Sequence, residues 1–318
     1  MNNAWSQQAK VLFSVVTLAS TSAFAADEAF KVSGFVDSQI GYNKTVHSVG
    51  FGTSIADGAV YLSKALGSGM AMVDLPFSLN SSTSSNIDWA QGKGQAFVSF
   101  NYGSGLSWRL GQFDGIFGLE RNDSKEIRFT QRGSLYGSQP VVMDALMVGY
   151  EISKILNVSI YAGAQDSTGT FASGKEAQYG AKISYDDAIR LSVGGYMQKL
   201  TSSTTRTYVN AVVGTKVSGV NLDGEFSMKK DGDGDAGTGF GLIAGYDMND
   251  SLSVGARGQM MSKLGSFNST TEVTVGPQFQ MTKDLRTKVD YTFGSDKLLS
   301  TSDARSRHAL NVAAVYSF

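Results

Sequence analysis

The sequence has no cysteine, three prolines and two histidines among its 318 residues. Without cysteine, the chain can form no disulfide and cannot be a cysteine-anchored lipoprotein. Proline cannot donate to a β-ladder, so its scarcity suits a chain that is strand almost throughout. The charges nearly cancel, to a net −1, which excludes a bulk attraction to nucleic acid.

Long apolar runs are also missing. After residue 28 each apolar stretch is short and broken by charges, whereas a membrane-spanning helix needs about 20 apolar residues. Residues 1–25 have the layout of a cleaved signal peptide, with Lys10, a short apolar stretch and the small-x-small pattern Ala23-Phe24-Ala25. We therefore expect an exported bacterial envelope protein whose mature part, residues 26–318, is a single domain.

Apolar and polar residues alternate in segments of about ten residues, which is the period of β-strands. In "LRTKVDYTF", Leu285 and Val289 share one face, and Lys288 and Asp290 share the other. Seven short turns alternate with eight longer polar loops, which predicts about sixteen strands, with 14 or 18 as alternatives. The predicted long loops are 43–54, 80–93, 115–140, 166–174, 199–205, 230–237, 262–269 and 295–304.

This turn and loop asymmetry predicts an all-β fold, a transmembrane antiparallel β-barrel with short periplasmic turns and long extracellular loops. A sheet in lipid can leave no open edge, so the last strand should pair with the first. A secreted β-sandwich also alternates, but it does not explain the asymmetry. Pro76 and Pro277 fall inside predicted strands, where they indicate bulges or misplaced boundaries.

The sequence ends on an alternating segment, "RHALNVAAVYSF". Every second position is apolar or aromatic: Leu310, Val312, Ala314, Tyr316 and Phe318. This pattern resembles the assembly signal of outer-membrane barrels, which the barrel-assembly machinery of that membrane reads. The two aromatic residues are expected in the girdle at the periplasmic interface.

If the apolar faces meet lipid, the polar faces line the interior, and sixteen strands enclose a water-filled channel. The longest loop, 115–140, also carries Phe117 and Phe129, so we expect it to pack against other residues. The candidate pore-lining residues are Arg109, Asp114, Glu120, Arg121, Asp123, Glu126, Arg128, Arg132, Lys182, Arg190, Arg257, Arg286, Lys288 and Asp290. Four strand cations among them, facing the loop acids, predict a small preference for anions: Arg109, Arg257, Arg286 and Lys288.

The stretches "LGQFDGIFGLE" (110–120) and "RGSLYGSQPVVMDALMVGY" (132–150) resemble the OmpL-like β-barrel porin family. That resemblance implies passive transport of small hydrophilic solutes and ions across the bacterial outer membrane, among outer-membrane lipid and lipopolysaccharide. Sixteen strands with an inserted third extracellular loop also resemble the general porins. In those proteins this loop folds into the pore and narrows it, and they form homotrimers.

Other functions are less well supported. His47 and His308 belong to no recognisable Ser–His or Asp–His constellation, so we expect neither an enzyme nor a cofactor. A non-conducting surface adhesin or structural barrel remains the alternative.

The stretch "DGDGDAG" places Asp231, Asp233 and Asp235 at the spacing of the first ligands of a calcium loop. The twelfth position of such a loop usually holds a glutamate ligand, but here it is Leu242. We interpret it as an acidic turn and keep it only as a weak metal candidate.

Overall fold

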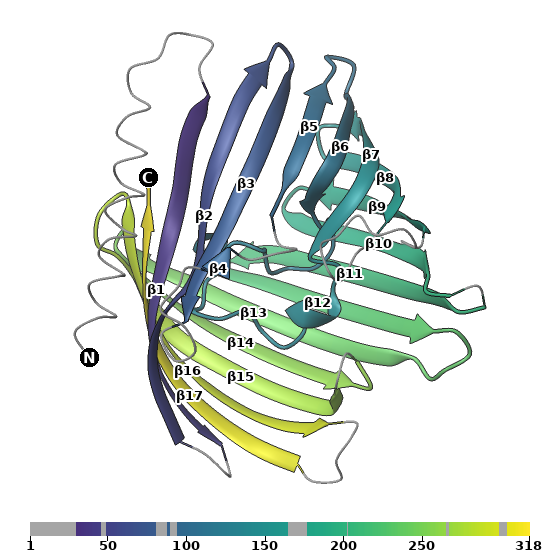
Figure 1. The fold of residues 1–318 in the computed structure, drawn as a ribbon. Coiled ribbons are helices and arrows are strands. Elements are labelled where there is room, and N and C mark those ends of the chain that lie inside the picture. The colour runs from purple at the N-terminus through teal and green to yellow at the C-terminus, as the bar shows by residue number, and fades with distance from the viewer. Residues whose placement is uncertain are drawn as a thin grey trace.

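The computed structural model describes residues 30–45, 49–80, 88–89, 94–164, 177–201, 203–264, 267–298 and 304–318. These residues form one ring of antiparallel strands (Figure 1). The predicted signal peptide and His47 lie outside the described residues. No helix of the described residues is long and apolar enough to cross a membrane.

Sixteen strands make the wall of the barrel. They are β1 (Lys31–Thr45), β2 (Val49–Leu66), β3 (Gly69–Asn80), β5 (Ala96–Asn101), β6 (Leu106–Asp114), β7 (Val142–Ser153), β8 (Leu156–Ala164), β9 (Ala177–Asp186), β10 (Ile189–Lys199), β11 (Thr205–Val217), β12 (Val220–Asp231), β13 (Gly237–Asn249), β14 (Leu252–Ser262), β15 (Phe267–Gln280), β16 (Leu285–Leu298) and β17 (Ala304–Ser317). A two-residue strand, β4 (Asp88–Trp89), pairs with the end of β3. Two short 3-10 turns, η2 (Ser124–Glu126) and η3 (Tyr136–Ser138), lie between β6 and β7.

The ring closes between its first and last strands. β1 pairs with β17 over eleven residue pairs, from Phe35 opposite Ser317 to Thr45 opposite Arg307. Every other barrel strand pairs antiparallel with its two sequence neighbours in the wall. The prediction of a closed antiparallel barrel of sixteen strands is therefore confirmed.

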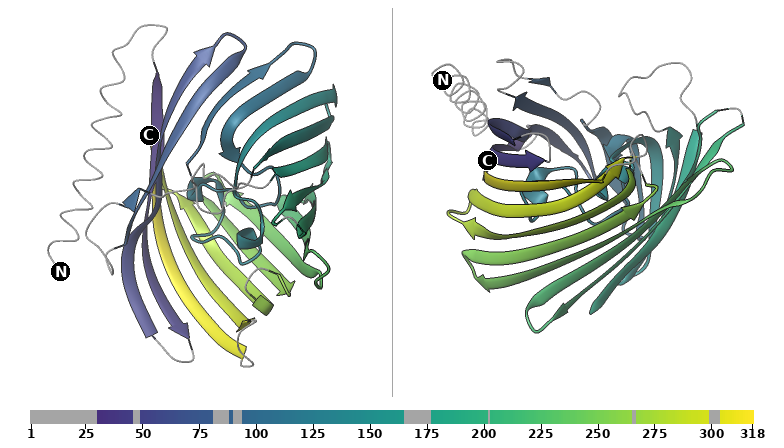
Figure 2. Two further views of the ribbon diagram at one scale, coloured as in Figure 1. Left: turned by 45° about the vertical axis from the view of Figure 1, so that its right-hand side comes forward. Right: turned by 90° about the horizontal axis from the view of Figure 1, so that it is seen from below.

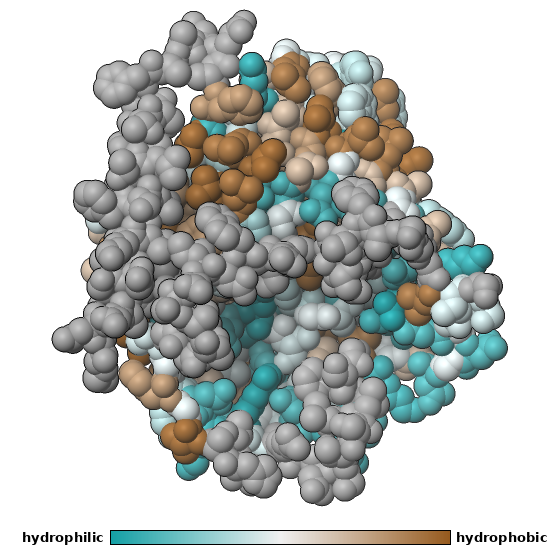
Figure 3. Space-filling view, viewed as in Figure 1, coloured by the Kyte–Doolittle hydropathy of each residue, from teal (hydrophilic) through white to brown (hydrophobic). Residues whose placement is uncertain are grey.

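The two faces of the wall differ in polarity, as the alternation predicts. Large apolar side chains are exposed on the outside, among them Leu110, Ile160 and Leu242, at 54%, 56% and 57% exposure. Figure 3 shows hydrophobic residues gathered over the upper part of its view, where β2, β3 and β5 to β8 lie. The charged strand residues Arg257 and Lys288 point inward and are almost fully buried.

Most of the predicted long loops are shorter than expected. β1 and β2 run through most of 43–54 and leave only 46–48 between them, and β12 and β13 leave 232–236. Backbone pairing does not require apolar side chains, so the ladders continue beyond the point where the apolar alternation ends. The connections that remain long are 81–95, which contains β4, and 115–141 and 165–176.

Both prolines within strands lie where strand pairing is irregular. Pro76 is opposite Ala59, directly after a register shift in the pairing of β2 with β3. Pro277 falls in a break of the β15–β16 ladder, which resumes with Gln278 opposite Lys288. A residue without an N–H is best tolerated at such positions, so the interpretation of bulges is confirmed for Pro76.

Candidate functional site

The connection between β6 and β7 lies inside the barrel. Figure 2 shows this stretch, residues 115–141, within the ring of strands. The N–H of Gly115 donates to the carbonyl of Val141 at 2.8 Å, which closes the base of the loop. We call residues 115–141 the inner segment, because side chains from strands on opposite sides of the ring contact it.

An aromatic cluster anchors the start of the inner segment. The ring of Phe117 packs against Tyr161, Tyr196 and Tyr208 of β8, β10 and β11, with ring centroids 6.2, 5.9 and 5.7 Å away. All four side chains are buried. The three tyrosines were not among the predicted site residues, although each lies on the inner face of its strand. This burial explains why the segment carries apolar side chains.

Arg257 of β14 joins the inner segment to the neighbouring strand. Its guanidinium lies 2.7 Å from Glu120 Oε1 and 2.9 Å from Glu272 Oε1 of β15. It also donates to the carbonyl of Gln131 at 2.8 Å and lies over the ring of Phe129. Only 2% of Arg257 is exposed. A cation so deeply buried requires paired charges and hydrogen bonds. Both terminal nitrogens of Arg257 have them, whereas its Nε has no hydrogen-bond partner among the described residues.

Lys288 of β16 holds the segment through backbone carbonyls. The ammonium has three hydrogens to donate. Its acceptors are the carbonyl oxygens of Ser124, Ile127 and Phe129, at 2.6, 2.7 and 3.3 Å. Lys288 is 1% exposed, so this side chain secures the segment at one point on the wall.

Inward carboxylates accept hydrogen bonds from the segment's backbone. Asp290 Oδ2 accepts from the N–H of Thr130 at 2.5 Å, and its Oδ1 accepts from the Thr130 hydroxyl at 2.9 Å. Glu225 of β12 accepts from the N–H of Leu119 at 3.0 Å and from Gln139 Nε2 at 2.8 Å. Glu225 was not in the candidate set, although its inward position on β12 follows from the alternation.

These contacts correct part of the predicted pore lining. Arg257, Lys288, Asp290 and Glu120 are at most 7% exposed, so they hold the segment and little of their surface borders water. Arg286 donates to the carbonyl of Lys125 at 3.1 Å. Three of the four predicted strand cations, Arg257, Arg286 and Lys288, are thus engaged by the inner segment, and the expected preference for anions stays a prediction.

The other candidates are distributed around the interior. Their contacts are Arg109 over the rings of Phe97 and Phe113, Lys182 with the Ile116 carbonyl, Arg190 with Asp223, Arg128 with Asp247, Arg132 with Asp57, and Asp114 with Asn122. Arg121 and Glu126 are exposed. These two side chains present charge to the remaining interior.

Among the candidate residues, Asp123 lies beside a tyrosine hydroxyl and near other carboxylates. Its carboxylate accepts a hydrogen bond from the Tyr61 hydroxyl at 2.5 Å and lies within electrostatic range of Asp74 and Asp114. Burial raises the pKa of Asp123, while the hydrogen bond from Tyr61 and the charge of Lys125 act in the opposite direction. The folded protein therefore holds a proton on Asp123 more tightly than the unfolded chain does.

Asp123→Asn is expected to flatten the pH dependence of stability. The free energy of unfolding should fall as pH rises above the ordinary carboxyl pKa, about 3.9, because the folded state must then give up a proton it binds tightly. Urea titrations of lipid-reconstituted protein from pH 4 to 8 measure this slope. Asp235→Asn is the control, because Lys263 lowers the pKa of that exposed carboxyl. An unchanged slope in Asp123→Asn would contradict the assignment.

The weak metal candidate has two of its carboxylates next to cations. Asp231 accepts two hydrogen bonds from Arg206, at 2.6 and 2.7 Å, and Asp235 lies 2.5 Å from Lys263 Nζ. Over the part of the chain that the structure describes, no three His, Cys, Asp or Glu side chains are grouped to hold a metal ion. The geometry favours the interpretation of an acidic turn.

The C-terminal aromatic residues lie at the seam of the barrel. Phe318 and Gly34 exchange backbone hydrogen bonds of 3.0 and 3.1 Å. A Cβ on Gly34 would come within 2.5 Å of the Phe318 ring, so the ring occupies the space that this glycine leaves. Tyr316 stacks on Phe318, and Leu310 and Val312 are exposed on the outer face.

An apolar exterior, a charged interior and an inward-folded connection in a closed sixteen-stranded wall define a transmembrane β-barrel of the porin class. The model of the family "Putative beta-barrel porin-2, OmpL-like" matches residues 29–318, so the chain belongs to that family, and the predicted resemblance is confirmed. Membership of a porin family supports the prediction that the chain is not an enzyme. No curated protein matches the sequence.

Solved structures share the fold at low sequence identity. The anion-selective porin from Comamonas acidovorans is 14% identical, with a TM-score of 0.64 over 92% of this chain and 100% of that one. The outer membrane channel DcaP of Acinetobacter baumannii is 14% identical, with a TM-score of 0.66 over 93% and 99%. The trimer form of OmpT of Vibrio cholerae is 12% identical, with a TM-score of 0.62 over 92% and 100%.

Proposed function

We propose that this protein is a porin of the bacterial outer membrane, which lets small hydrophilic solutes and ions diffuse through its charged interior. The observation that carries the proposal is the inner segment, held inside a polar barrel by buried ion pairs. The exposed Arg121 and Glu126 require water beside them, because a charge removed from water without a partner is strongly destabilising. A water-filled interior narrowed by a fixed segment is the arrangement that a diffusion channel needs.

The same proposal predicts what the protein contacts in the outer membrane. The apolar outer face would contact outer-membrane lipid and lipopolysaccharide. The trimer form of the similar Vibrio cholerae OmpT supports a homotrimer. The alternating last strand would be read by the barrel-assembly machinery. The inner segment would be the third extracellular loop, folded into the pore.

Single-channel recording tests the proposed function. Purified folded protein in a planar lipid bilayer should produce stepwise conductance that rises with salt concentration and persists at low voltage. A heat-denatured sample of the same preparation is the control. If the folded protein inserts but conducts nothing, the porin proposal fails, and the non-conducting adhesin or structural barrel takes its place.

Phe318→Ala is expected to lower the amount of folded barrel that reaches the outer membrane. The substitution removes the ring that fills the space over Gly34 at the seam, and it weakens the assembly signal. Heat-modifiable mobility of the protein in gels of membrane fractions measures the folded amount. Phe318→Tyr keeps the aromatic ring and should assemble normally. Equal folded amounts of Phe318→Ala and the unmutated protein would contradict this role.

A further inference from the structure

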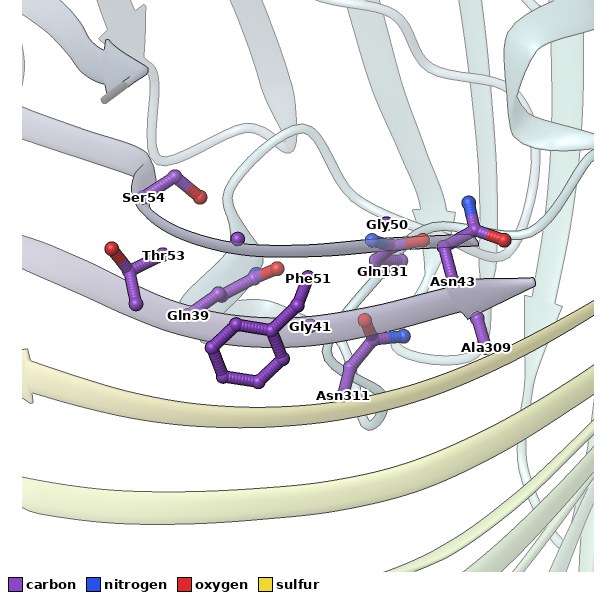
Figure 4. A pocket seen from close by; sticks show the side chains of 11 residues that line it. Gln39, Gly41, Asn43, Gly50, Phe51, Thr53, Ser54, Gln131, Ala309 and Asn311 are labelled. Carbon is purple, nitrogen blue, oxygen red and sulfur yellow. The ribbon is translucent and has the colours of Figure 1, made fainter. Parts of the chain in front are cut away.

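A cleft of about 480 Å³ lies between the inner segment and the wall of β1, β2 and β17. Its volume is in the range of small-molecule sites, about 300–1,000 Å³. Figure 4 shows the eleven residues that line it, and none of these described residues is ionisable. In an interior where charged side chains are common, an uncharged cleft is a distinct chemical environment.

Amide side chains from three parts of the chain line the cleft: Gln39 and Asn43 from β1, Gln131 from the inner segment and Asn311 from β17 (Figure 4). Each amide can both donate and accept hydrogen bonds. Such a lining matches a ligand that also has many donors and acceptors and no charge.

Two of the amides are held in fixed orientations. Gln39 Nε2 donates to the Thr130 carbonyl at 2.8 Å and to Asp37 Oδ2 at 3.2 Å, so the amide hydrogens are engaged and Oε1 remains to accept. Asn311 Nδ2 donates to Asp290 Oδ1 at 3.4 Å, and its Oδ1 faces Gly41. Acceptors oriented before the ligand arrives bind hydroxyl groups at a low cost in entropy.

Glycines keep the cleft open. Gly50 and Gly52 lie directly opposite Asn43 and Gly41 in the β1–β2 ladder, so their missing side chains would point to the same side as those residues. A Cβ on either Gly50 or Gly52 would meet no atom within 4 Å, whereas a Cβ on Gly41 would lie 2.8 Å from Asn311 Oδ1. The wall is therefore recessed here, and a side chain added at position 52 would enter the cleft without a clash.

We propose that this cleft binds an uncharged solute rich in hydroxyl groups, such as a sugar, on its way through the channel. The inference rests on the proposed function, because it adds a solute-binding step to a diffusion channel. An adjoining cleft of about 320 Å³ contains Arg132, Arg257 and Arg307. These three arginines are paired with Asp57, Glu120 and Glu272, so the neighbouring charges are largely cancelled and do not select an anion.

The test measures binding and conduction separately. Saturation-transfer NMR with maltose on folded, detergent-solubilised protein should show saturable binding, and glucuronate should bind more weakly. Gly52→Phe should abolish maltose binding by filling the cleft. Asn43→Ala should weaken binding about tenfold through lost hydrogen bonds. Gly103→Phe, at another glycine with open space in the β5–β6 turn, should bind maltose as the unmutated protein does.

The same variants in planar bilayers separate the two proposals. Maltose should reduce the current saturably in the unmutated channel and not in Gly52→Phe. Binding without any conductance would overturn the proposed function and leave the sugar site standing. Conductance without maltose binding, maltose binding that survives Gly52→Phe, or glucuronate binding as tight as that of maltose would each overturn the sugar site.

Discussion

Arg257→Ala is expected to lower the free energy of unfolding by about 3–5 kcal/mol, because it leaves buried carboxylates without their cation. Glu120 and Glu272 are 7% and 4% exposed, so water cannot replace the lost guanidinium. Glu272 keeps its pair with Arg307, but Glu120 loses its ion pair to the wall. The inner segment should then leave its position for part of the time, and single-channel conductance should rise. Urea unfolding in lipid vesicles and bilayer recordings measure the two effects.

Two further variants test whether burial causes this loss. Arg190→Ala removes an ion pair with Asp223 whose arginine is 55% exposed, and it should cost less than about 1 kcal/mol. Adding Glu120→Gln to Arg257→Ala removes one uncompensated charge and should recover part of the stability. Equal losses for Arg257→Ala and Arg190→Ala would show that the buried ion pair does not hold the segment.

Ile160→Arg is expected to destabilise the barrel by about 2–4 kcal/mol, the cost of a cation on the lipid face near the middle of a membrane. Ile160 lies at the centre of β8, on the outer face, with 56% of its surface exposed. In water such an exposed position would tolerate arginine. Folding yield and urea unfolding in lipid vesicles measure the difference.

Met281→Arg is the matched control for depth. Met281 is also exposed, at 62%, but it lies in the short connection between β15 and β16, at an end of the barrel. Arginine there should cost about 0–1 kcal/mol, as it does near the membrane interface. If the two arginine variants unfold alike, the exposed apolar band does not face lipid.

The barrel was predictable because the alternation of apolar and polar residues can be recognised within each strand, without knowing which distant residues it contacts. The alternation around Val289 assigns each side chain of β16 to a face, and the structure keeps Lys288 and Asp290 inside. Strand ends were less predictable. β2 continues through Gly50 and Gly52, which were predicted to lie in the loop 43–54 because glycines indicate turns, although the backbone pairs there.

The site was harder to predict because its contacts join distant parts of the chain. Arg257 and Glu120 are 137 positions apart, and nothing in the local pattern shows that they meet. The alternation correctly indicated that Arg257 points inward. It could not indicate that the inner segment would exclude water from Arg257 and cancel its charge. Tyr61 was missed because a tyrosine on an inner face is unremarkable until Asp123 lies against its hydroxyl.

The pairing of β1 with β17 also has a consequence for how the barrel folds. Its eleven residue pairs join the two ends of the described chain, so they are the most non-local contacts in the sheet. Contacts of this kind form late and slowly, because the entropy of the intervening chain must be given up before they form. Until they form, two strand edges stay unpaired, and such edges can pair with other chains. We therefore expect closure of this seam to limit the folding rate, and aggregation to compete with it most strongly at that step.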